Sequence, residues 1–145
     1  RFMTKKISKF SYIRNPNKRV DEISKKMNLA NLINRKMKTL TPGELRWVLL
    51  ATMIGADSKV LFIDEIEQHI GKKEQKILLS ILHRKINYDG VTLITSTQNK
   101  DILSRIASVT ITLDNGRITS VRSSNNKRDY SKNKKNNRVN RKNKK

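Results

Sequence analysis

The 145-residue chain contains no cysteine, which excludes disulfides and thiolate metal sites. Aromatic residues are few, with three Tyr, three Phe and one Trp, so a stacking platform for single-stranded nucleic acid is not indicated. No apolar run approaches the roughly 18 to 20 residues that span a bilayer. No secretory signal is recognisable either, and we therefore expect a cytoplasmic protein.

Glycine is also scarce, and none of the five glycines opens a phosphate-binding loop. The motif G-x-x-x-x-G-K-S/T, whose backbone cradles nucleotide phosphates, occurs nowhere in the sequence. Without that motif, these 145 residues are not expected to hold the β-phosphate of a nucleotide unaided.

Acidic residues are outnumbered by 33 Lys and Arg to 12 Asp and Glu, so the formal net charge is +21. Such a charge implies attraction to polyanions or to an anionic membrane surface. Residues 123–145 carry ten basic and one acidic side chain, a net +9, and only Tyr130 and Val139 are apolar. We expect this tail to be disordered, because so little apolar area cannot offset the entropy of ordering it. The tail is consistent both with a polyanion contact and with a merely solvated end.

Apolar periodicity predicts alternating helices and strands along the rest of the chain. Helices are expected over residues 19–27, 28–34, 42–54, 73–86 and 100–108, and strands over 60–63 and 91–95. A hairpin is expected over 109–113 and 117–122, and the alternation over 7–13 is compatible with one further strand. The apolar run 60–63 is typical of a strand buried on both faces. This order indicates an α/β fold with a largely parallel sheet.

The stretch Thr41-Pro42-Gly43-Glu44 predicts a helix start. Thr41 fits the N-cap, Pro42 fits the first helical position, and Glu44 completes a capping box. The helix is expected to stop at Gly55. Taken alone, the stretch can be explained as a helix N-cap without a further function.

Two adjacent carboxylates, Asp64 and Glu65, follow the apolar run 60–63. The carboxyl ends of parallel strands are where open α/β folds bind ligands. Carboxylate oxygens suit Mg²⁺, and a second carboxylate that does not bind the metal suits a general base. Strands often end in acidic residues, so this pattern alone does not establish a site.

The order and spacing of these motifs resemble the C-terminal half of an ATP-binding cassette (ABC) ATPase domain over about residues 19–121. Leu40-Thr41-Pro42-Gly43-Glu44 is similar to the L-S-G-G-Q/E signature of that family, and the strand ending in Asp64-Glu65 is similar to its Walker B element. Residues 113–118 look like its closing hairpin. Residues 19–32 resemble the end of the helical subdomain in transporter-type cassettes.

The resemblance implies roles for these residues. Asp64 would support the Mg²⁺ of a bound ATP, and Glu65 would be the catalytic base for the attacking water. Thr41, Gly43 and Glu44 would contact the γ-phosphate bound to the opposite subunit of a dimer.

The sequence departs from the family at several positions. Pro42 replaces a signature glycine, Ile66 replaces the proline after the carboxylate pair, and Gly71 stands at the D-loop aspartate. Thr97 occupies the catalytic switch position, where the family has a histidine, and it cannot bring a positive charge to the phosphate. We therefore expect the chain alone to be inactive, as an N-terminally missing half or a degenerate cassette would be.

The predicted fold is α/β, with the mainly parallel sheet of an ABC-type nucleotide-binding domain that lacks its Walker A half. Residues 1–39 would be a remnant of the helical subdomain, 40–122 the C-terminal part of the core and 123–145 the tail. The predicted function is a partial or degenerate ATP-binding and hydrolysing subunit of an ABC transporter. Its expected partners are a transmembrane permease subunit at the inner face of the cell membrane and a second cassette. The altered signature favours peptide transport, because the signature of some peptide-transporter subunits is similarly altered.

Two other functions stay open. One is a soluble, translation-associated ABC ATPase that binds ribosomes or RNA through the tail, since the signature of that class usually ends in Glu, as at Glu44. The transporter-like region before Leu40 argues against it. The other is a nucleic-acid-binding module without ATPase activity, which rests on charge alone because no reader motif supports it.

Four further side chains and one tryptophan have simpler interpretations. His69 and His83 are expected on the surface, because no partner stands at metal-ligand spacing. Glu67 and Glu74 are expected on a solvated face, and Trp47 in the core.

Overall fold

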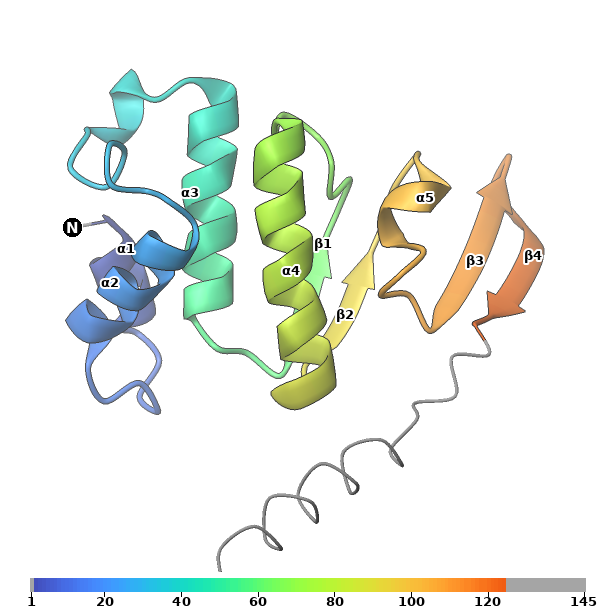
Figure 1. Ribbon diagram of the computed structural model, residues 1–145, viewed down its shortest axis with the longest axis horizontal. Coiled ribbons are helices and arrows are strands. Elements are labelled where there is room, and N and C mark those ends of the chain that lie inside the picture. The colour runs from blue at the N-terminus through green and yellow to red at the C-terminus, as the bar shows by residue number, and fades with distance from the viewer. Residues whose placement is uncertain (1, 125–145) are drawn as a thin grey trace, which may run out of the picture. The chain divides into compact units, whose positions relative to one another are not determined.

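The computed structural model describes residues 2–124, and the contacts divide the chain into two compact units after Ile106. The first unit contains α1 (Phe2–Ile7), α2 (Pro16–Lys26), the 3₁₀ helix η1 (Met37–Thr39), α3 (Pro42–Gly55), β1 (Val60–Ile63), α4 (Lys72–Tyr88), β2 (Thr92–Thr95) and α5 (Lys100–Leu103) (Figure 1). The second unit contains β3 (Val109–Asp114) and β4 (Arg117–Ser123). Within the described residues, no helix is both long and apolar enough to cross a membrane.

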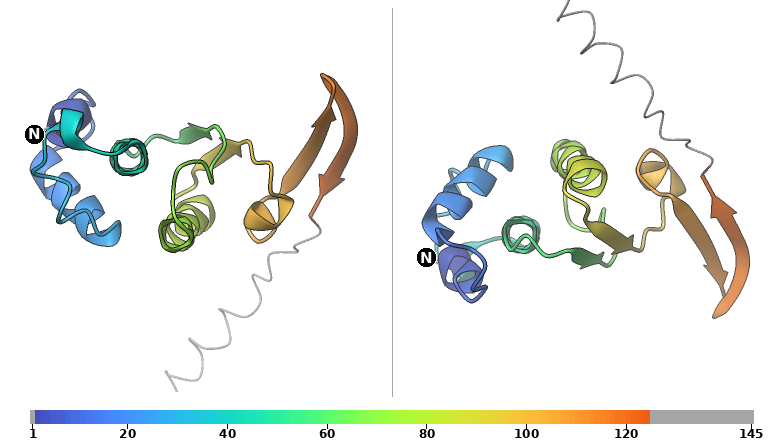
Figure 2. Two further views of the ribbon diagram at one scale, coloured as in Figure 1. Left: turned by 90° about the horizontal axis from the view of Figure 1, so that it is seen from above. Right: turned by 90° about the horizontal axis from the view of Figure 1, so that it is seen from below.

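The strands β1 and β2 pair in parallel, as predicted. Figure 2 shows α4 on one side of this pair. Leu61 and Ile63 are buried, whereas Val60 and Phe62 alternate with them and are 46% and 65% exposed. The prediction that β1 is buried on both faces is therefore wrong, because no element among residues 2–106 covers the second face.

The helix α3 begins as the sequence predicts. The Thr41 hydroxyl accepts a hydrogen bond from the Glu44 backbone N–H at 3.3 Å, and the Glu44 carboxylate accepts one from the Thr41 N–H at 2.8 Å. The helix includes Gly55 and is capped by Ala56, so the predicted stop is one residue early. Gly55 serves packing instead, because a Cβ there would lie 2.8 Å from the Ile7 side chain of α1.

The helices α1 and α2 pack on α3. Asn15 caps α2 through a 3.0 Å hydrogen bond from the Lys18 N–H, and Pro16 occupies the first turn, so α2 begins earlier than predicted. Trp47 of α3 is buried as expected, and its indole N–H donates to the Met27 carbonyl at 3.0 Å. This bond fastens the end of α2 to α3.

Three predicted elements differ from the structure. Residues 7–13 form no strand, because Ile7 ends α1 and turns follow it. Residues 28–34 form turns rather than a helix, since Asn28 adopts a φ of +54°, which ends the helical path after α2. The helix α5 ends at Leu103, earlier than predicted.

The second unit is the predicted hairpin. Asn115 and Gly116 have φ values of +47° and +75°, the conformation that a tight two-residue hairpin turn requires. The strand β4 continues to Ser123, which the sequence places at the start of the tail. Residues 125–145 of the predicted tail lie outside the described residues. The assignment of parts of the chain to cassette subdomains stays a prediction.

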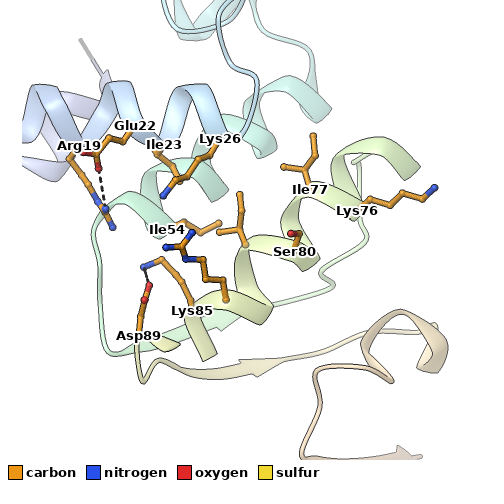
Figure 3. Close-up of a pocket in the computed structure, with 12 residues that line it drawn as sticks. Arg19, Glu22, Ile23, Lys26, Ile54, Lys76, Ile77, Ser80, Lys85 and Asp89 are labelled. Atoms are coloured by element: carbon orange, nitrogen blue, oxygen red, sulfur yellow. Dashed lines mark ion pairs between the residues drawn. The ribbon is translucent and has the colours of Figure 1, made fainter. Parts of the chain in front are cut away.

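A cluster of charged side chains around the buried Lys85 joins α2 to the C-terminal ends of α3 and α4. The Lys85 ammonium lies 2.6 Å from the Asp57 carboxylate and 3.7 Å from that of Asp89, and the Lys85 side chain is 8% exposed. Arg19 also binds Asp57, at 3.0 Å. Figure 3 shows Arg19, Lys85 and Asp89 beside a groove of about 670 Å³ with Ile54 and other apolar side chains in its wall.

We expect Asp57→Asn to be less stable than the parent near neutral pH, and the difference to shrink in acid. Burial raises the pKa of Asp57. The hydrogen bond and charge of Lys85, with the charges of Arg19 and Lys59, lower this pKa by more than burial raises it, so it lies below the ordinary 3.8. A carboxyl with a depressed folded pKa contributes stability above its unfolded pKa and loses it as pH falls through the folded pKa. Denaturant unfolding from about pH 7 to about pH 2 measures this. Asp101→Asn is the control. If the stability of Asp57→Asn depends on pH in the same way as that of the parent, the prediction is wrong.

Candidate nucleotide-binding edge

The two carboxylates Asp64 and Glu65 lie directly after β1, at the carboxyl end of the parallel pair, as the sequence predicts. Ser96 follows β2 and binds both of them. Its hydroxyl donates to the Asp64 carboxylate and accepts a hydrogen bond from the Glu65 N–H at 2.8 Å. Glu65 has a φ of +44°, which costs energy in a residue with a Cβ, so this bond helps to hold a strained backbone at the edge.

Arg46 of α3 fixes the same two residues from the other side. Its guanidinium donates to the carbonyl of Asp64 at 2.5 Å and to that of Glu65 at 2.9 Å. Such charge-assisted bonds are stronger than those between neutral groups. Arg46 was not among the predicted site residues, although it is the one charged residue between Glu44 and Gly55 in an otherwise largely apolar helix.

The predicted signature residues lie together at the first turn of α3. The hydrogen bond from the Thr41 N–H outweighs burial, and together with Arg35 it holds the pKa of Glu44 below its ordinary 4.5. The Arg35 guanidinium lies 2.7 Å from the Glu44 carboxylate. Glu44 is therefore ionised at neutral pH and bound within the chain, and its contact with a partner's phosphate stays a prediction.

Gly43 brings the signature turn against the segment that follows the carboxylates. A Cβ at this position would lie 2.6 Å from the backbone carbonyl oxygen of His69. A residue with a side chain therefore cannot occupy position 43 unless the backbone moves. The signature and the segment 66–71 consequently hold each other in place.

We expect Gly43→Ala to destabilise the fold by about 1–3 kcal/mol, as overpacking against backbone does. Inside a helix, alanine ordinarily stabilises a protein by roughly 1 kcal/mol relative to glycine, so the expected change in unfolding free energy has the opposite sign. Gly71→Ala is the matched control, because its Cβ would meet only the Glu74 carboxylate, at 2.6 Å, and that flexible side chain can turn away. Denaturant unfolding compares the two variants, and an equal loss in both would contradict the contact.

Thr97, at the predicted switch position, is bound to Glu67. The Thr97 hydroxyl donates to Glu67 Oε1 at 2.8 Å, and the Gln98 N–H donates to the same oxygen at 2.9 Å. Burial raises the pKa of Glu67, but hydrogen bonds from its own backbone N–H and from Gln98 and Thr97 lower it below the ordinary 4.5. The expectation that Glu67 lies on a solvated face is wrong, because its carboxylate turns inward to these donors. His69 and His83 are exposed, as expected.

The edge fits part of a magnesium–nucleotide site. Asp64 is exposed and offers carboxylate oxygens, the ligands that Mg²⁺ prefers. Among residues 2–124, no group of three or more His, Cys, Asp or Glu is placed to hold a metal ion. Mg²⁺ at Asp64 would therefore take most of its ligands from water and phosphate oxygens, as this ion commonly does.

No family model matches the chain. Curated relatives include the maltose/maltodextrin import ATP-binding protein MalK of Salmonella typhimurium (strain LT2) and that of Escherichia coli (strain K12). Each is 28% identical over 108 residues, and the match covers 72% of this chain and 28% of the relative. The chain thus spans little more than a quarter of the length of these relatives.

Solved structures show the same likeness. The ATP-binding subunit of an ABC transporter aligns with a TM-score of 0.71 and 14% identity over 84% of this chain and 52% of its own. An ATP-binding cassette solved as a dimer with ADP and phosphate gives 0.67 and 20% identity, over 74% of this chain and 47% of its own. The cbiO1 protein of Clostridium perfringens, part of an ABC transporter complex, gives 0.59 and 20% identity, over 81% and 49%.

The chain therefore has the mixed α/β fold of about half of an ABC ATPase domain. The resemblance inferred from the sequence, to the ATP-binding domains of ABC transporters, is confirmed by the relatives and by the structures. The missing Walker A half and the disordered tail stay predictions.

Proposed function

We propose that the chain supplies the signature and the acidic strand end of an ATP-binding cassette that powers an ABC transporter. The observation that carries this proposal is the bonding of Arg46 to the carbonyls of Asp64 and Glu65. Because Arg46 belongs to the helix that begins at the signature, both elements are presented by one connected piece of structure.

Within this site, Asp64 supports Mg²⁺ and Glu65 is the base that takes a proton from the attacking water. Bound ATP and Mg²⁺ would supply the phosphoryl group and neutralise its charge. Glu65 suits the role of base, because the Gln98 side-chain amide donates to one of its carboxylate oxygens at 3.2 Å and leaves the other oxygen for water. Thr97 brings no positive charge to the phosphate, so slow hydrolysis is expected.

The signature acts on a second cassette in this proposal. The first turn of α3 offers the Gly43 backbone N–H, which has no helical partner, and the positive end of a helix dipole, both of which favour phosphate. Pro42 has no N–H, and that of Glu44 donates to the Thr41 hydroxyl. Thr41, Gly43 and Glu44 would face the γ-phosphate held by that cassette. The dimer among the similar structures supports this arrangement. A transmembrane permease subunit at the inner face of the membrane would be the second partner.

The proposal is tested on the native gene product, purified from membranes together with the proteins that accompany it. We expect a permease and a phosphate-loop-bearing cassette to copurify, with Mg²⁺-dependent ATP hydrolysis that Asp64→Asn reduces. Copurification with ribosomes, and no permease, would instead support the translation-associated alternative. Peptide uptake by the reconstituted complex would test the preferred substrate class.

A further inference from the structure

The turn after β2 is held by one carboxylate, that of Glu67. Its Oε1 accepts hydrogen bonds from the Thr97 hydroxyl and the Gln98 N–H. The Thr97 oxygen in turn accepts one from the Asn99 N–H at 3.0 Å. Three successive residues of the turn are thus fixed, directly or through one bridge, by Glu67.

This turn places the side chain of Gln98 on Glu65. Gln98 Nε2 donates to Glu65 Oε1 at 3.2 Å. The backbone of Glu65 is already held by Ser96 and Arg46, so its side chain is the part that this amide fixes. The bonds therefore run from Glu67 through the turn to the carboxylate at the strand end.

The Glu67 carboxylate holds the turn through one of its two oxygens. Its second oxygen, Oε2, is buried and has no hydrogen-bond partner among the described residues. An unsatisfied buried acceptor ordinarily destabilises a protein. Oε1, which carries both bonds to the turn, is therefore the oxygen through which Glu67 acts.

We propose that Glu67 and Gln98 are positioning residues for Glu65: Glu67 fixes the turn, and Gln98 aims one Glu65 oxygen. The proposal rests on the function proposed above, in which Glu65 is the base. It gives the switch position a structural explanation, because Thr97 serves Glu67 rather than the phosphate.

The bond network is tested first without nucleotide, by NMR of the Gln98 side-chain amide in the full chain. We expect separated proton shifts and slow hydrogen exchange in the parent, and free-amide values in Glu65→Ala and Glu67→Ala. Glu67→Gln should keep the parent values, because its amide oxygen still accepts from Thr97 and from the Gln98 N–H. Glu22→Gln on α2 is the control and should change nothing. Free-amide values in the parent would overturn the network.

The positioning role is then tested by ATP hydrolysis in the copurified complex. Glu67→Ala and Gln98→Ala are each expected to lower kcat roughly tenfold to a hundredfold, the loss that follows misplacement of a reacting group, with little change in KM. The double variant should be no worse than Gln98→Ala, because residues that act in series are not additive. Glu67→Gln should restore most of kcat, which a loss of folding would not permit.

The outcomes separate the two proposals. If Glu65→Gln stops hydrolysis while Gln98→Ala and Glu67→Ala do not slow it, the positioning role is wrong and the base assignment stands. If Glu65→Gln leaves hydrolysis unchanged, the base assignment is wrong and the positioning role is lost with it. Additive losses in the double variant would also overturn the pathway from Glu67 through Gln98.

Discussion

Glu65→Gln is expected to lower kcat for ATP hydrolysis in the native complex by on the order of 10²–10⁴-fold, the usual contribution of a general base. The substitution keeps the size of the side chain and keeps an oxygen that can accept from Gln98. It removes only the ability to take a proton from water. Nucleotide binding should therefore persist, and the variant should hold ATP longer than the parent. Phosphate release and retained ATP, measured on the same sample, check both expectations.

The control for this variant is Glu22→Gln, which makes the same chemical change on α2, where the carboxylate contacts Arg19 at 3.5 Å. We expect it to hydrolyse ATP at the parent rate. A parent-like rate in Glu65→Gln as well would contradict the role of Glu65. Loss of nucleotide binding in Glu65→Gln would indicate damage to the edge rather than removal of a base.

Leu82→Ala is expected to cost about 2–5 kcal/mol of unfolding free energy, the range for a leucine deleted from a packed core. Leu82 lies on α4 and is fully buried, as is Leu78 one turn earlier. Because α4 covers one face of the β1 and β2 pair, a cavity there loosens the support of both strand ends (Figure 2). Unfolding in urea gives the free energy directly.

The matched control is Leu49→Ala on α3, the same deletion at a side chain that is 41% exposed. It removes less buried area and should cost clearly less. Equal losses in the two variants would contradict the assignment of Leu82 to the core. A smaller loss at Leu82 than at Leu49 would contradict it more strongly.

Local patterns were predicted well because the residues that decide them are neighbours in the chain. The capping box needs only Thr41 and Glu44, and the hairpin turn needs only Asn115 and Gly116. The strand Val60–Ile63 follows from four consecutive apolar residues. The local pattern did not predict residues 28–34 correctly. A positive φ at Asn28 ends the helix there, and the neighbouring residues do not indicate it.

The bonding of the candidate site could not be predicted, because its partners come from distant parts of the chain. Arg46 binds carbonyl groups, and a backbone acceptor leaves no trace in the sequence. From the sequence, Glu67 was expected on a solvated face and Thr97 at the switch position, and only the fold brings their side chains within 2.8 Å. The sequence located the two carboxylates, but the groups that hold them needed the tertiary structure.

The exposed face of β1 marks another limit of the sequence pattern. A continuous apolar run predicts burial on both sides of a strand, yet Val60 and Phe62 are exposed, as is Ile94, which pairs with Phe62 on β2. The apolar run shows that the strand is suited to burial on both faces. Among residues 2–106, however, only one face of the strand is covered.

If the signature turn closes over nucleotide held by a partner, ATP should protect a single cysteine placed at that turn from labelling. Because the chain has no cysteine of its own, Thr41→Cys provides a unique reactive group at that turn. It is introduced into Glu65→Gln, so that ATP persists in the copurified complex. Asn87→Cys, at the exposed end of α4, is the control. We expect ATP with Mg²⁺ to slow maleimide labelling at position 41 and to leave labelling at position 87 unchanged. Equal labelling at position 41 with and without ATP would contradict it.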